Sequence, residues 1–168
     1  MKRMITLLLA LVLALSLAAC GQKEDNIGGD TAGDQSVDLR AAYEAGIKQV
    51  QDELGDNAPV LLEETAVELL NSYYPGLEKA QIKQSVFFLS PTATYCEVSM
   101  VEAASAADAE LVRQSFQSRV DEMANNTDYP EEAGMWKNCA TVSVNGNYVV
   151  LEVLPEGCTV PDAFLAKF

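Results

Sequence analysis

The chain of 168 residues contains no histidine. Histidine is the commonest general base and metal ligand, and it activates the nucleophile of Ser-His and Cys-His enzymes. Its absence removes these arrangements from consideration. The chain also lacks a closely spaced Cys-X-X-Cys pair, a phosphate-cradling glycine loop and the alternating acidic loop of calcium sites. We therefore expect no metal and no cofactor.

Positive charge is scarce as well, because 11 lysines and arginines stand against 25 aspartates and glutamates. Residues 1–19 hold two of the cations, Lys2 and Arg3, and no acid, so the chain without them carries a net charge of 9 − 25 = −16. This charge excludes nucleic acid as a partner and disfavours adhesion to anionic headgroups or wall polyanions. A cationic partner stays open, as does the simpler interpretation that acidity keeps the protein soluble.

The first 19 residues have the features of an export signal. The two cations precede an apolar or small-residue run from Ile5 to Ala19, whose 15 residues are fewer than the roughly 20 that span a bilayer. The run ends in Leu17-Ala18-Ala19-Cys20, which resembles the signal of bacterial lipoproteins. We expect cleavage before Cys20 and a lipid on its thiol, which anchors the protein at the outer face of the cytoplasmic membrane. The alternative is a plain secretory peptide with an incidental cysteine.

A spacer follows the predicted anchor. Residues 21–36 are rich in glycine and aspartate and contain one sizeable apolar side chain, Ile27. Such a segment cannot bury enough apolar surface to fold alone. We assign residues 20–37 to the lipidated cysteine and a flexible acidic spacer, and residues 38–168 to a single domain.

The domain alternates helical and strand patterns. Apolar residues at three- and four-residue spacing predict helices, and alternating runs rich in β-branched residues predict strands. The sequence favours an α+β domain, with the helices packed on one face of a mostly antiparallel four-stranded sheet. The predicted order is a helix from Asp38 to Leu54, a helix from Leu62 to Tyr73, a hairpin of Gln84–Leu89 and Thr94–Val101, a helix from Ser105 to Met123, a hairpin of Ala140–Val144 and Tyr148–Leu154, and a short helix from Val160 to Phe168.

Three cysteines remain beyond the predicted lipid site. Cys96 shares a strand face with Val98 and Met100, so we expect a buried, unreactive thiol. Cys139 and Cys158 flank the second hairpin and come near the same end of it. We predict a disulfide between these two, because an exported protein meets oxidising conditions.

Several short motifs between about residue 73 and residue 168 occur together in a recognisable order. They are the segments Tyr73 to Leu77, Arg119, Tyr129-Pro130, Trp136-Lys137 and Asn145 to Val149. In this order they resemble the family catalogued as domain of unknown function 4358, which occurs in lipoproteins of Gram-positive gut bacteria. The resemblance implies a location at the outer face of the cytoplasmic membrane and no assigned activity.

Four residues are candidates for a binding surface. Tyr129 and Trp136 lie in the segment from Asn126 to Asn138, which we expect to be a long loop, and loops on a rigid scaffold often carry binding residues. Tyr74, at a helix end, and Arg119, within one turn of Phe116, complete the set. For each the alternative is structural: Trp136 fills the edge of the core, Tyr74 packs, and Arg119 pairs with a carboxylate.

The functional expectation is a membrane-anchored surface lipoprotein. Its domain would be a non-catalytic binding or accessory module in cell-envelope assembly or modification, with an envelope protein or a wall polymer as partner. The first alternative is an envelope enzyme that uses carboxylates or an unpaired cysteine. The second is a solute-capturing lipoprotein of a transporter, although one domain of this size lacks the two lobes that such proteins usually have.

Overall fold

The computed structural model describes residues 37–91, 95–158 and 164. The predicted signal peptide, Cys20 and the spacer up to residue 36 lie outside these residues, and so does the predicted closing helix apart from Phe164. Within the described part of the chain, no helix combines the length and the apolar character needed to cross a membrane.

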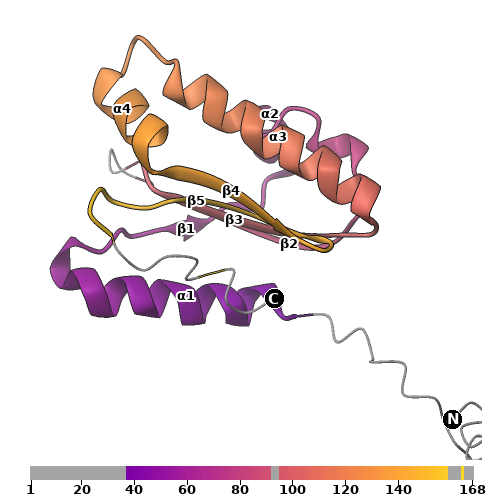
Figure 1. Cartoon of the computed structure of the whole chain (residues 1–168), viewed down its shortest axis with the longest axis horizontal. Coiled ribbons are helices and arrows are strands. Elements are labelled where there is room, and N and C mark those ends of the chain that lie inside the picture. The colour runs from indigo at the N-terminus through magenta and orange to yellow at the C-terminus, as the bar shows by residue number, and fades with distance from the viewer. Residues whose placement is uncertain (1–36, 92–94, 159–163, 165–168) are drawn as a thin grey trace, which may run out of the picture. The chain divides into compact units, whose positions relative to one another are not determined.

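The fold is α+β and is built on one antiparallel sheet, as predicted (Figure 1). The sheet has five strands where four were expected, in the order β1-β2-β3-β5-β4. The additional strand is short and pairs Leu62 with Leu89 and Glu63 with Phe88 at one edge. The strands are β1 (Leu62–Glu63), β2 (Ile82–Leu89), β3 (Glu97–Ala103), β4 (Ala140–Asn145) and β5 (Tyr148–Val153).

Helices cover both faces of the sheet, whereas the sequence led us to expect them on one face. Figure 1 shows α1 beneath the sheet and α2, α3 and α4 above it. Two separate core clusters confirm this arrangement, one on each face. The helices are α1 (Leu39–Leu54), α2 (Val67–Tyr73), α3 (Ala106–Ala124) and α4 (Pro130–Cys139), with short 3-10 turns at Gly55–Asn57 and Leu77–Lys79.

Helix α1 begins where the sequence predicted. Oδ1 of Asp38 accepts hydrogen bonds from the backbone N–H groups of Arg40 (3.0 Å) and Ala41 (3.1 Å), which caps the otherwise unpaired first turn. The buried stripe of the helix packs on the lower face of the sheet, where the ring of Tyr43 stacks on Phe88 with centroids 3.5 Å apart. This helix encloses the smaller of the two sides of the core.

Helix α3 dominates the opposite face. Oγ of Ser105 accepts a hydrogen bond from the backbone N–H of Asp108 (3.2 Å), which caps the first turn of α3. Phe116 is fully buried and meets the rings of Tyr74 and Phe87 at centroid distances of 5.4 and 6.5 Å. The end of α2 is thereby fixed against both α3 and the sheet.

Two predicted elements differ in the structure. The second helix was expected from Leu62, but α2 begins at Val67, because Leu62 and Glu63 instead take backbone hydrogen bonds at the free edge of β2. The segment Asn126–Asn138 was expected to be a loop, but most of it forms α4. Pro130 occupies the first turn of that helix, where its missing N–H costs nothing.

Candidate functional site

A buried polar cluster lies between the sheet and α3. The hydroxyl of Tyr74 donates a hydrogen bond to Oε1 of Glu97 (2.6 Å) and lies 2.7 Å from Oγ of Ser99. Ser99 also donates to the same Glu97 oxygen at 3.2 Å. Side chains alternate along a strand, so Glu97 and Ser99 both point to the face that α3 covers. Glu97 is only 2% exposed.

Arg119 of α3 completes this arrangement, which we call the Glu97 cluster. A terminal guanidinium nitrogen of Arg119 lies 3.4 Å from Oε2 of Glu97. The guanidinium carbon is also 5.0 Å from the ring centre of Tyr73 and 5.1 Å from that of Trp136. Cation–π contact with two rings holds the arginine in place, so it joins α2, α3, α4 and β3.

Burial controls the electrostatics of the cluster. Removal from water raises the pKa of Glu97, and the charge of Arg119 together with the hydrogen bonds opposes that shift. Burial and the neighbouring Glu97 carboxyl raise the pKa of Tyr74 well above its usual value. The pKa of Glu132, on the first turn of α4, is likewise raised by burial and partly restored by Arg119.

A recess of about 70 Å³ adjoins the cluster and is lined in part by Glu97, Arg119, Glu132 and Trp136. Two buried donors, Nε of Arg119 and Nε1 of Trp136, have no hydrogen-bond partner among the described residues. This volume is far below the roughly 300–1,000 Å³ of ligand pockets. The cluster therefore has the dimensions of a structural network.

A much larger pocket, of about 820 Å³, opens at the end of the sheet; we call it the α4 pocket. Its walls come from α4, from the segment Asp56–Val60 after α1, and from Pro155 and Glu156 after β5. The volume falls within the usual range for ligand pockets, roughly 300–1,000 Å³. Its apolar lining includes Ala58, Pro59, Val60, Cys96, Pro130 and Met135, and its acidic residues are Asp56, Glu131 and Glu156.

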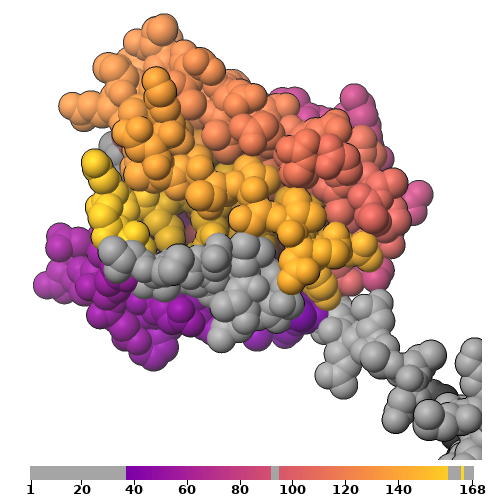
Figure 2. Space-filling model, in the orientation of Figure 1, coloured from indigo at the N-terminus to yellow at the C-terminus, as the bar shows by residue number. Residues whose placement is uncertain are grey.

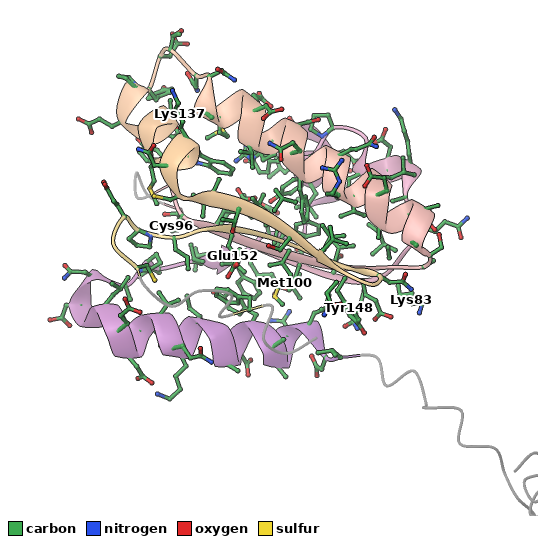
Figure 3. The ribbon with its side chains drawn as sticks, in the orientation of Figure 1. Lys83, Cys96, Met100, Lys137, Tyr148 and Glu152 are labelled. Atoms are coloured by element: carbon green, nitrogen blue, oxygen red, sulfur yellow. The ribbon has the colours of Figure 1, made fainter. Side chains whose placement is uncertain are left out.

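The figures show how the walls meet. In Figure 2 the yellow end of the described chain lies between the orange surface of α4 and the violet end of α1. Figure 3 shows Cys96 at the end of the sheet beneath α4. Cys96 lines both the α4 pocket and the small recess, so the two cavities are neighbours.

The structure brings three of the four predicted binding residues together. Tyr74, Arg119 and Trp136 are all part of the Glu97 cluster, with Tyr74 fully buried and Trp136 only 2% exposed. These positions agree with the structural alternatives. Tyr74 packs in the core, Arg119 pairs with a carboxylate, and Trp136 fills the edge of the core. Tyr129 lies apart, 58% exposed, at the N-cap of α4.

Sequence reasoning missed Glu97, although a signal for it exists. Glu97, Ser99 and Val101 share one face of a strand whose every residue is buried. An acid on such a face requires partners, because an unpaired buried carboxylate is costly. That requirement points to a polar cluster and to a cation on a neighbouring helix.

The described cysteines Cys96, Cys139 and Cys158 are free thiols in the structure, so the predicted bridge between Cys139 and Cys158 is not formed. Cys139 ends α4 on the upper face, whereas Cys158 packs against the core cluster of the lower face. Proximity along the hairpin therefore does not bring the sulfurs together. The pKa of Cys139 is raised by burial and by the carboxylate of Glu156, which disfavours its reactive thiolate.

No group of three or more potential metal-ligating acids or thiols is assembled among the described residues. Comparison with curated proteins and with solved structures found no match. A match to one protein family covers residues 56–154, from the 3-10 turn after α1 to the end of the sheet. The chain belongs to that family, which is described as a domain of unknown function (DUF4358).

Proposed function

We propose that this chain is a lipid-anchored protein of the outer face of the cytoplasmic membrane and serves as a non-catalytic binding or accessory module of the cell envelope. Cys20 carries the anchor, and the α4 pocket is the binding surface. The anchor rests on the export signal that ends at Cys20. The binding surface rests on the pocket.

The proposal is supported mainly by the size of the pocket and by the fixed position of one of its walls. A cavity of about 820 Å³ has one wall, α4, that is fixed to the core through Trp136 and Arg119. A rigidly held wall loses little conformational freedom when a partner binds. The segment Asn126–Asn138 supplies Pro130, Glu131 and Met135 to this pocket, although the two residues predicted from it to bind, Tyr129 and Trp136, do not line the pocket.

The enzyme alternative has weaker support. Glu97 and Glu132 have raised pKa values, as a general acid would, but the recess that they line, about 70 Å³, is far smaller than a typical ligand pocket. Nucleophilic catalysis by Cys96 or Cys139 lacks its usual base, because the chain contains no histidine.

The proposal is tested by photo-crosslinking on intact cells. A photoreactive amino acid replaces the exposed Asn138, which lines the pocket, in the full-length protein. We expect a discrete adduct of defined mass. A second variant, Gly134→Phe, fills the pocket, because nothing lies within 4 Å of a Cβ placed at Gly134, and it should abolish the adduct without unfolding the protein.

The matched control places the same photoreactive group at Glu44, which is exposed on α1 and outside the pocket. This position should give no adduct that Gly134→Phe removes. Equal labelling from both positions, or an adduct from Asn138 that survives Gly134→Phe, contradicts the proposal. The anchor is tested separately by mass spectrometry of the mature N-terminal peptide, which should begin at Cys20 with a diacylglyceryl thioether.

A further inference from the structure

We infer that the α4 pocket receives a basic segment of a partner protein that inserts an apolar side chain between flanking lysines or arginines. This inference rests on the proposed function, because it names the chemistry of what the pocket binds. It follows from the distribution of charge around the pocket and of apolar surface within it.

The charged residues of the pocket all have the same sign. Asp56, Glu131 and Glu156 come from three separate segments, and all three are exposed. Among the residues that the structure describes, no lysine or arginine lines the pocket. Carboxylates from three segments around one opening repel each other unless a cation lies between them. The negative charge also acts on another residue that lines the pocket, because Glu156 contributes to the raised pKa of Cys139.

Apolar side chains make up much of the pocket's lining. Met135, on α4, gives it an adaptable wall, since an unbranched thioether side chain fits apolar groups of varied shape. Val60, in the wall formed by the segment Asp56–Val60, is 67% exposed, so its side chain is accessible to a ligand. An apolar side chain that enters here removes Val60 and Met135 from water.

The acidic residues and the apolar lining of the pocket together indicate the chemistry of the partner. A polyanion such as a wall polymer meets three carboxylates and gains nothing from the apolar interior, whereas an uncharged apolar ligand leaves the acidic rim unpaired. A basic segment with an apolar anchor satisfies both. The overall excess of acid, 25 against 11 cations in the whole chain, adds long-range attraction for the same segment.

The test uses the full-length lipoprotein in detergent and three short fluorescent peptides, composed of lysine and leucine, lysine and serine, or glutamate and leucine. Fluorescence anisotropy should rank the lysine–leucine peptide as the tightest binder. Its affinity should fall as salt is raised, because exposed ion pairs are screened.

Two triple variants separate the pocket's rim from the overall charge. Asp56→Asn with Glu131→Gln and Glu156→Gln should weaken the lysine–leucine peptide about tenfold, as expected for three exposed ion pairs. The control, Glu44→Gln with Glu68→Gln and Glu122→Gln, removes the same charge from exposed positions outside the pocket and should cost far less.

Equal losses in the two triple variants, or equal binding of the glutamate–leucine peptide, overturn the inference. Failure of the inference is distinguishable from failure of the proposed function. If the rim variant keeps the cellular adduct at Asn138 and Gly134→Phe removes it, the pocket binds a partner that is not basic. If Gly134→Phe leaves the adduct unchanged, the pocket is not the binding surface and both claims fall.

Discussion

The phenol of Tyr74 donates a 2.6 Å hydrogen bond to Oε1 of Glu97 inside the core. This bond joins the end of α2 to the first residue of β3, and Arg119 continues the connection from Glu97 to Trp136 on α4. The position of α4, and therefore the shape of the pocket, depends on this chain of contacts.

Removal of the hydroxyl in Tyr74→Phe should lower the free energy of unfolding by about 1.5–3 kcal/mol, since it deletes a buried hydrogen bond to a group that can carry charge. Urea denaturation measures the change. Tyr129→Phe is the control, because that ring is exposed and should change stability by less than about 0.5 kcal/mol. Equal effects of the two variants would show that the Tyr74 hydroxyl contributes nothing specific.

Trp136→Ala should be far more damaging than any change at Tyr129. The indole is 2% exposed and packs on the core and on Arg119, so truncation should cost about 3–5 kcal/mol. Thermal unfolding of Trp136→Ala and Tyr129→Ala checks this difference. A small loss at Trp136 would mean that α4 is not held by its indole, which removes the physical basis for a rigid pocket wall.

Glu132→Gln should stabilise the protein at neutral pH and have little effect in acid. Burial raises the pKa of Glu132 above its usual 4.5, so the unfolded state ionises first and the free energy of unfolding falls as pH rises through the folded-state pKa. A neutral glutamine does not titrate and avoids that loss. The difference between variant and wild type should therefore be near zero at about pH 4 and grow toward about pH 8.

Urea denaturation across this range measures the effect of Glu132→Gln. Glu97 titrates in the same sense in both proteins, so to first order its contribution cancels in the difference. A difference that shrinks as pH rises would mean that the attraction of Arg119 for Glu132 outweighs the cost of its burial.

Two helical glycines should respond to alanine with opposite signs. Gly134→Ala should stabilise α4 by about 0.5–1 kcal/mol, because alanine is the better helix former and nothing lies within 4 Å of the added Cβ. Gly46→Ala should destabilise α1, because the new Cβ overlaps the ring of Phe164, and overpacking costs about 1–3 kcal/mol. Melting temperatures of the pair give the result. A shift of the same sign in both would contradict the packing of Phe164 on α1.

Local sequence signals predicted several elements well. Asp38 caps α1, Ser105 caps α3, and Gly146, with φ of 59°, closes the β4–β5 hairpin. Each signal acts within a few residues, through capping hydrogen bonds or through the left-handed turn that glycine permits. Distant parts of the chain contribute little to these outcomes.

The predictions differed from the structure where contacts between distant parts of the chain determine the conformation. Val149, Val150 and Leu151 are consecutive and all buried, which requires cover on both faces of the sheet, yet their run was read only as a strand. Pro130 followed by two glutamates is a signal for a helix start, but the segment Asn126–Asn138 was read as a long loop. Tyr74, Arg119 and Trp136 were named from the sequence, but Glu97, which joins them, was not, and the pocket depends on three distant segments that only the fold brings together.

Hydrogen exchange measured on the lipoprotein in its own membranes, and again after purification in detergent, tests the binding surface most directly. If the α4 pocket binds an envelope partner, amides in Pro130–Cys139 and in the segment Asp56–Val60 should exchange more slowly in the membranes, while those of α1 exchange equally in both samples. Unchanged exchange around the pocket, with protection elsewhere on the domain, would contradict the account.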